Sequence, residues 1–169
     1  MKKLISVIVS LVSLVTLASA QNTYQSAIGA RIGDGYADLF SASYKTFVSD
    51  PGAIELNLGF RSYGVPHYNW VDLSFSASYQ YHFKIEAVEG LRWFIGGGLV
   101  AFNSFSSYSN YAGLGLGIFP TGGADYKFAN IPLDLSVDIR PTLALVKPYS
   151  YYNTFYPGNF GLAARYTFR

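Results

Sequence analysis

Two histidines, His67 and His82, carry the side chains of this chain that are best suited to proton transfer near neutral pH. Hydrolysis of the triad type needs a serine that a histidine activates and a carboxylate that orients the histidine. The residues around His67 read PHYN and contain no serine, and His82 lies inside a long alternating segment. Neither histidine predicts a catalytic site, and we expect His82 to be a buried hydrogen-bonding group.

The other motifs that could hold a ligand are weak. The chain has no cysteine, and its histidines and carboxylates show no metal-ligand spacing. The run Gly96-Gly97-Gly98 has strand pattern on both sides, whereas a phosphate loop needs a helix N-terminus after its glycines. We expect these glycines to permit curvature and close packing against Phe94 or Phe119, and we expect no metal or cofactor.

The segment at residues 70–83 reads WVDLSFSASYQYHF and separates polar from apolar side chains. Between residues 71 and 83 every odd position is apolar or aromatic, and every even position is polar. Side chains of a strand point alternately to its two faces, so the segment predicts a strand with one face of each kind. It exceeds the usual length of about five or six residues and has aromatic ends, which favours a strand that crosses a membrane.

Residues 1–20 have the layout of a secretory signal peptide. Two lysines precede an apolar stretch at residues 4–17, and residues 18–20 read ASA, a small-residue cleavage signal. The apolar stretch is short for a membrane helix. We therefore expect residues 21–169 to form one secreted domain, which must be stable without disulfides.

Composition limits the partners and the location. The chain has 12 basic and 10 acidic residues, and removal of the two leader lysines leaves equal numbers, so no electrostatic argument favours nucleic acid. Only 13% of residues are charged, against about 25% in soluble domains. The expected mature chain contains no run of about 18 apolar residues that would predict a membrane helix.

Turn residues recur at even spacing, and helical periodicity is nearly absent. We predict an all-β fold, an eight-stranded antiparallel up-and-down transmembrane β-barrel. Its expected strands are residues 24–32, 36–48, 53–62, 70–83, 91–102, 111–128, 133–140 and 159–169. Because Pro141 cannot donate to a ladder, we expect a break or bulge there.

The expected connections also alternate in length. Those at residues 49–52, 84–89 and 129–132 are short, and those at 63–69, 103–110 and 147–158 are longer. The first connection, at residues 33–35, is a short exception. Short turns at one end and long loops at the other are typical of outer-membrane barrels, whose even strand number places both termini on the periplasmic side.

Nearly every charge in these strands falls on the polar phase, and the exception, Asp38, should lie near a rim. A lipid-facing Arg or Lys at mid-bilayer costs roughly 2–4 kcal/mol, so the pattern predicts charges that face the lumen. Seven bases and five acids should pair there, because unpaired buried charge is costly and eight strands leave no aqueous channel. With His82, the expected lumen network consists of Arg31, Lys45, Glu55, Arg61, Asp72, Arg92, Asp125, Lys127, Asp134, Asp138, Arg140 and Arg165.

A soluble lipocalin-like barrel or sandwich is the alternative fold, and it would place the apolar phase inside. The low charge content argues against it. The polar phase is also rich in glycine and serine, whose small side chains suit a narrow lumen better than a solvated surface.

Several segments resemble small outer-membrane β-barrel proteins of Bacteroidetes. They read SYKTFVSDPGAIELNLGF, YQYHF, LRWFIGGGLVAF, GADYKFANIPLDLSVDIRPTL and GLAARYTF, and the match covers about residues 24–169. The resemblance implies an eight-stranded barrel with no assigned biochemical activity. It also implies a terminal assembly signal formed by Gly161, Tyr166 and Phe168, although Arg169 follows the phenylalanine on which typical members end. A plain lipid-facing aromatic pair is the alternative for Tyr166 and Phe168.

The expected external loops are rich in Tyr, Ser and Asn. They read YGVPHYNW at residues 63–70, NSFSSYSNY at 103–111 and PYSYYNTFYP at 148–157. This mixture is typical of binding loops, although the upper aromatic girdle of a membrane barrel also uses tyrosine and tryptophan. The candidate binding surface consists of Tyr63, His67, Tyr68, Tyr108, Tyr151 and Tyr152.

We therefore expect an outer-membrane protein that is not an enzyme and that stabilises the envelope or binds an unidentified extracellular ligand through its loops. Its expected partners are outer-membrane lipid or lipopolysaccharide and, during insertion, the barrel-assembly machinery, and we expect a monomer. Two alternatives remain: a lipid A-modifying enzyme of the deacylase type, and a small-solute pore.

Overall fold

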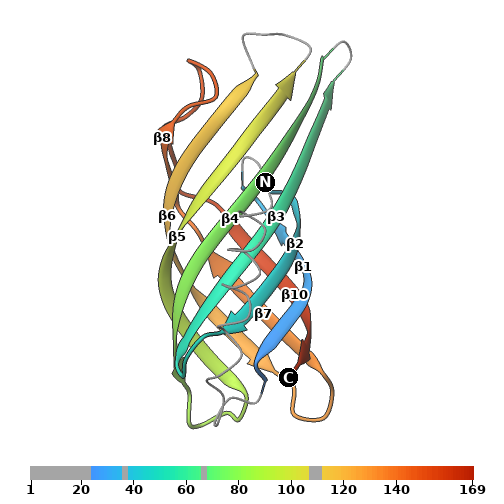
Figure 1. The fold of residues 1–169 in the computed structure, drawn as a ribbon, viewed down its shortest axis with the longest axis vertical. Coiled ribbons are helices and arrows are strands. Elements are labelled where there is room, and N and C mark those ends of the chain that lie inside the picture. Colours follow the sequence, from blue (N-terminus) through green and yellow to red (C-terminus); the bar gives the residue numbers. More distant parts are fainter. Residues whose placement is uncertain (1–23, 36–37, 66–67, 107–111) are drawn as a thin grey trace, which may run out of the picture.

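The computed structural model describes residues 24–35, 38–65, 68–106 and 112–169, and every regular element in these ranges is a β-strand (Figure 1). The predicted signal peptide lies outside them. None of these ranges contains a helix that is long and apolar enough to cross a membrane. The strands are β1 (Ser26–Gly33), β2 (Phe40–Phe47), β3 (Gly52–Val65), β4 (Tyr68–Lys84), β5 (Leu91–Ser106), β6 (Gly113–Lys127), β7 (Leu133–Ile139), β8 (Thr142–Val146), β9 (Phe155–Tyr156) and β10 (Phe160–Phe168).

The strands form one antiparallel sheet that closes on itself. Each strand from β1 to β6 pairs with the next, β7 pairs with β10, and β10 pairs back with β1. The two remaining elements lie in the connection between β7 and β10, where β8 pairs with the upper part of β6 and β9 pairs with β8. The predicted eight-stranded antiparallel barrel is confirmed.

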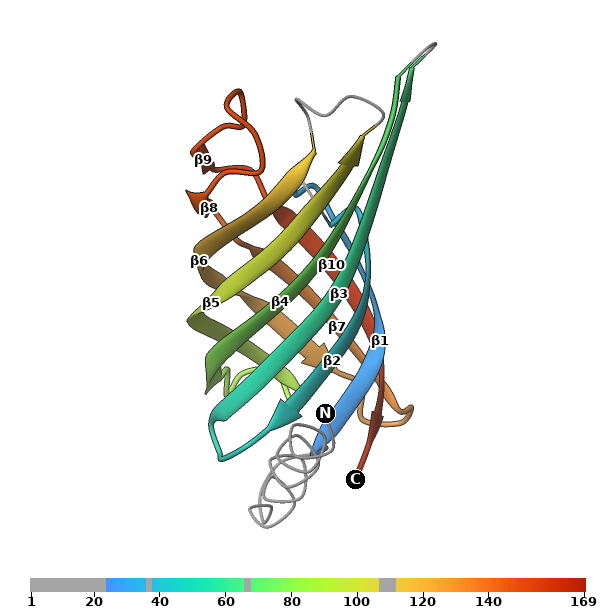
Figure 2. The same ribbon diagram turned by 45° about the horizontal axis from the view of Figure 1, so that its top comes forward.

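The two ends of the barrel differ in height and in the length of their connections. The turns at residues 48–51, 85–90 and 128–132 lie with the C-terminus at the lower end of Figure 1. At the opposite, upper end β3 and β4 stay paired as far as Val65 and Tyr68 and rise above the rest of the wall (Figure 2). The predicted loop at residues 63–69 is therefore wrong, because most of it continues the two strands.

The connection between β1 and β2 also differs from the prediction. The expected strand 36–48 begins only at Phe40, and the connection spans residues 34–39 rather than 33–35. The amide of Gly33 donates to the carbonyl of Leu39 at 3.0 Å, which closes this loop at its base. Asp38 consequently lies in the connection, where the alternation of a strand does not fix its direction.

The predicted break at Pro141 is confirmed, since β7 ends at Ile139 and β8 begins at Thr142. The registers on either side, Gly122 opposite Ile139 and Ile118 opposite Leu143, place Pro120 of β6 opposite Pro141. Neither proline has an amide hydrogen, so no ladder bond can form between them. Above the break, β8 still pairs with β6, and its other neighbour is β9.

Glycines make room for the large side chains inside the barrel. A Cβ atom on Gly115 would overlap the ring of Phe102, and one on Gly161 would overlap the guanidinium of Arg31. Eight strands enclose only enough space for side chains to fill, so each large group needs a small neighbour on the facing wall. The glycines thus position both the aromatic and the ionic side chains of the lumen.

Candidate functional site: the ionic lumen

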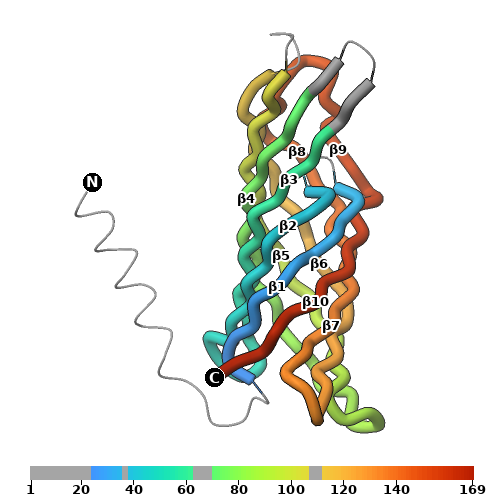
Figure 3. The backbone as a smooth tube through the Cα atoms, turned by 90° about the vertical axis from the view of Figure 1, so that its right-hand side faces the viewer, coloured from blue at the N-terminus to red at the C-terminus, as the bar shows by residue number. Residues whose placement is uncertain are grey.

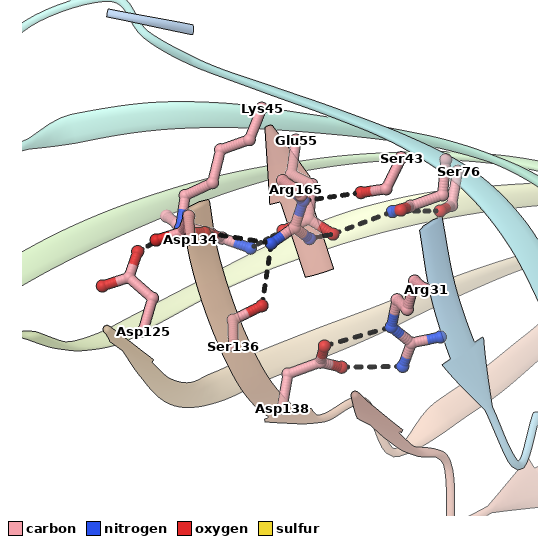
Figure 4. Close-up of polar contacts among 12 residues, drawn as sticks. Arg31, Ser43, Lys45, Glu55, Ser76, Asp125, Asp134, Ser136, Asp138 and Arg165 are labelled. Atoms are coloured by element: carbon pink, nitrogen blue, oxygen red, sulfur yellow. Dashed lines mark hydrogen bonds and ion pairs between the residues drawn. The ribbon is translucent and has the colours of Figure 1, made fainter. Parts of the chain in front are cut away.

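The upper part of the lumen holds a run of alternating charges. The guanidinium of Arg31 donates to both carboxylate oxygens of Asp138, at 3.0 and 2.7 Å (Figure 4). It also donates to Asp38 at 2.8 Å. Asp138 also pairs with Nε of Arg140 at 2.8 Å. Arg31 and Arg140 are fully buried, so these carboxylates take the place of water around both cations.

The run continues toward the lower end through Glu55. This carboxylate pairs with Arg140 at 2.5 Å and with Arg165 at 3.0 Å, and it also accepts from Gln80 at 2.8 Å. Arg165 extends the run to Asp134 at 3.6 Å. Two cations that lie far apart in the sequence therefore share one buried carboxylate, which makes Glu55 the centre of the network.

A second cluster lies near the lower end. Nζ of Lys45 pairs with Asp125 at 2.6 Å, and Nε2 of His82 lies 3.3 Å from the same carboxylate. The imidazole is buried between the rings of Phe47 and Phe94, whose centroids are 5.0 and 5.2 Å away. This enclosure leaves His82 without access to a lipid substrate and gives the predicted deacylase alternative no support.

Aromatic rings fill the space below this cluster. Tyr24 packs edge-on against Phe47 at 5.3 Å, and the guanidinium of Arg92 lies over the same ring at 5.2 Å. Tyr24 precedes β1 and is only 3% exposed, and burial raises the pKa of its phenol well above the usual value. The phenol therefore stays neutral and adds no charge to the network.

Two residues depart from the predicted network. Lys127 ends β6, where the carbonyls of the following turn are within reach, and its ammonium donates to Phe128 and, at 2.9 Å, to Ile131. Its expected place among the lumen ion pairs is therefore wrong. Asp38 instead joins the network, and its pKa is raised by burial although Arg31 beside it acts in the opposite direction.

These two changes balance the interior charge. In place of seven bases and five acids, the described part of the chain turns six of each toward the lumen or its upper rim. Arg61 and Asp72 form the uppermost members, as register partners on β3 and β4, and Arg61 also donates to the carbonyl of Gly35. The twelve residues are Arg31, Lys45, Arg61, Arg92, Arg140, Arg165, Asp38, Glu55, Asp72, Asp125, Asp134 and Asp138.

A small cavity of about 40 Å³ lies in the upper lumen beside Arg140. Ser74 and Ser76 line it, and the ring of Tyr152 lies above, stacked on Phe102 with centroids 5.2 Å apart. A buried water needs roughly 10–15 Å³, so the cavity has room for about three waters and not for an organic ligand. The lumen thus has space for a few waters at its mouth and is filled with side chains below it.

The candidate loop surface is only partly described. His67 and Tyr108 lie outside the described residues, as do the side chains of Tyr63 and Tyr68. Tyr151 is 80% exposed at the tip of the connection between β8 and β9. Its neighbour Tyr152 is half-buried against Phe102 and presents only part of its ring to the outside.

The three residues of the expected assembly signal lie on β10. Tyr166 and Phe168 point outward from the barrel and are 59% and 39% exposed. Gly161 faces inward beneath the guanidinium of Arg31, which gives this glycine a packing role in the folded barrel.

Sequence reasoning expected glycines to pack against Phe94 or Phe119, but it did not place an aromatic cluster inside the lumen. Phe47, Phe94, Phe102 and Phe119 are all buried, and the guanidinium of Arg140 lies 5.7 Å from the ring of Phe119. Their parity could have revealed them, since Phe47 shares the inward phase of Lys45. Within the described residues no group of three or more His, Cys, Asp or Glu could hold a metal ion.

A closed antiparallel wall with ions inside and apolar residues outside defines this protein as a small eight-stranded β-barrel. Two solved structures share the fold. Neisserial surface protein A (NspA) has 13% identity and a TM-score of 0.50, with 85% of this chain and 95% of that chain covered. The N-terminal β-barrel domain of Pseudomonas aeruginosa OprF has 21% identity and a TM-score of 0.52, with 88% and 100% covered.

Both similar structures are small eight-stranded outer-membrane barrels. At identities of 13% and 21%, these similarities show a shared fold and nothing further. No protein-family model matches the sequence, and no curated protein matches it.

Proposed function

We propose that the protein is an integral outer-membrane barrel with a sealed lumen, which serves the envelope as a structural or surface-interaction protein. The observation that carries this proposal is the inverted polarity of the wall. Arg31, Lys45 and Arg165 are 0% exposed, whereas Leu58, Leu99 and Leu162 are 63–65% exposed. Soluble monomers rarely expose large contiguous apolar surfaces, and a bilayer is the solvent that suits this one.

The ion network supports a sealed lumen rather than a pore. Each charge of the central run has a partner of opposite sign, and the aromatic rings of Tyr24, Phe47 and Phe94 fill the space near the lower end. Eight-stranded barrels enclose too little space for an aqueous channel, whereas barrels of 16 or more strands do form one. Function then depends on the surfaces that face lipid and the outside.

The upper loops are the surface proposed for interaction. Tyr151 is the most exposed large hydrophobic side chain among the described residues there, and Lys147 and Asn153 of the same connection are also exposed. Rigid aromatic area next to small hydrogen-bonding groups is typical of binding loops. The extracellular ligand itself is unidentified.

We extend this proposal to the location of the protein, its family, its oligomeric state and its insertion into the membrane. The alternating strands and the expected signal peptide support an outer-membrane location with both termini in the periplasm. The resemblance of the segments quoted above supports membership of the Bacteroidetes barrel family. We further propose a monomer whose outward aromatic pair on β10, Tyr166 and Phe168, guides insertion by the barrel-assembly machinery.

Three measurements on the full-length protein expressed in a Gram-negative host test this function. Membrane fractionation should place it in the outer membrane, and the purified protein should need detergent to remain monomeric. In a planar bilayer it should give no steady, large-conductance openings. Recovery as a soluble monomer, or sustained open-channel current, would contradict the proposal.

A further inference from the structure

A hollow of about 580 Å³ is cut into the outer face of the barrel wall. It crosses four neighbouring strands, β6, β7, β10 and β1, of which β1, β10 and β7 lie toward the viewer in Figure 3. Its walls are outward-facing apolar side chains, Ile32, Val137, Phe160 and Leu162, which are 52–65% exposed. These residues belong to the apolar belt that the proposed function places in lipid.

Glycine forms the floor of this hollow. Gly122 lies on the outward phase of β6, opposite Ile139 of β7, and a Cβ atom there would meet nothing closer than a carbonyl oxygen 3.7 Å away. The space above Gly122 is therefore open. The backbones of Gly33, Gly123 and Gly161, whose Cβ positions point inward, also line the hollow.

A polar group lies at one edge of the hollow. Asp34 follows β1, is exposed, and its amide donates to the carbonyl of Phe160 at 2.9 Å. The connection that contains Asp34 is at the upper end of the barrel, on the side of the external loops. An apolar trough that leads to a carboxylate at this level matches a lipid tail with a hydrogen-bond-donating headgroup.

We propose that this hollow binds one acyl chain of an outer-membrane lipid, with the headgroup beside Asp34. The inference rests on the proposed function, because only a membrane-embedded wall presents this surface to lipid. An apolar depression in a bilayer must be filled by a chain, and the ordered walls would hold that chain longer than the convex surface elsewhere. The site thus distinguishes one bound lipid from the mobile lipid around the barrel.

The test is native mass spectrometry of the protein reconstituted in vesicles of phosphatidylethanolamine and phosphatidylglycerol and then extracted in detergent. The wild type should retain one phospholipid. Gly122→Leu directs a side chain into the hollow from a position where the Cβ atom meets no clash, and it should reduce that retention at least fivefold. Gly97→Leu is the matched control, because Gly97 is also outward-facing with space for a Cβ atom, yet lies on β5 outside the hollow.

Phe160→Ala provides a second variant that removes one wall without adding bulk, and it should also lower retention. Folding of each variant is checked by its heat-modifiable gel mobility. Retention that is absent in the wild type, or equal in the wild type and Gly122→Leu, would overturn the inference while leaving the barrel in the membrane. A protein that is soluble without detergent would instead overturn the proposed function.

Discussion

Strand β10 shows the contrast between the two faces of the wall within four residues. Leu162 is 65% exposed, whereas Ala163 is 5% and Arg165 is 0% exposed. In a soluble domain these values would be reversed. The outer face therefore needs an apolar environment such as lipid. The inner face instead surrounds its ions with carboxylates, hydroxyls and rings of the protein itself, which replace water.

The largest effect on this contrast should come from Glu55, which neutralises two buried cations. Glu55→Ala removes the buried carboxylate that Arg140 and Arg165 share and leaves each cation with one weaker or shared partner, Asp138 or Asp134, so we expect the free energy of unfolding to fall by about 3–5 kcal/mol. Urea unfolding in detergent micelles measures it. The control is Glu86→Ala at an exposed turn position, for which we expect a change within ±0.5 kcal/mol. Equal effects for both variants would show that the network does not stabilise the barrel.

The outer face should respond to charge according to depth. Leu58→Arg places a cation on the lipid side of the wall and should cost about 2–4 kcal/mol when the protein is unfolded from vesicles. Ser62→Arg lies on the same strand and phase near the upper end of the barrel, and should cost about 0–1 kcal/mol. The same cost at both positions in vesicles would contradict a lipid-facing belt.

Glycine substitutions compare the faces by volume rather than by charge. Gly115→Ala would overlap the buried ring of Phe102, and we expect about 1–3 kcal/mol of destabilisation from overpacking. Gly97→Ala points outward, where its Cβ atom would lie 3.4 Å from the carbonyl oxygen of Phe119 without a clash, and it should be neutral or slightly stabilising. Thermal unfolding of both variants in one detergent decides whether the lumen is packed as tightly as described.

The smallest effect is expected at the loops. Tyr152→Ala removes a ring that stacks on Phe102 and should cost about 0.5–1.5 kcal/mol, whereas Tyr151→Ala should leave stability unchanged. If the loops bind a ligand, Tyr151→Ala should weaken cell-surface binding while folding stays intact. A stability loss at Tyr151 equal to that at Tyr152 would show that both rings are structural.

The alternation of polar and apolar residues in the sequence was sufficient to predict the barrel fold and to predict which face of β4 points into the lumen. The even spacing of polar residues from Asp72 to His82 gave β4 its phase, and Pro141 gave the break between β7 and β8. Both features are local, since side-chain direction along a strand has a period of two and proline lacks a donor wherever it stands.

The pairing inside the lumen could not be predicted in the same way. Arg31 and Asp138 lie 107 residues apart, and their contact depends on the register of the strands between them. Asp38 was placed on the outer phase because its strand was expected to begin at residue 36, whereas β2 begins at Phe40. Lys127 failed for a related reason, since a long side chain at a strand end can reach turn carbonyls instead of the lumen.

The most direct test of the inverted wall is the rate at which single lysines react with a water-soluble amine reagent in the folded, detergent-solubilised protein. Lys45 is fully buried beside Asp125, whereas Lys147 is exposed in an upper loop. Quantified by mass spectrometry, Lys147 should react quickly and Lys45 only after unfolding in urea. Rapid labelling of Lys45 in the folded protein would contradict a lumen sealed around its ions.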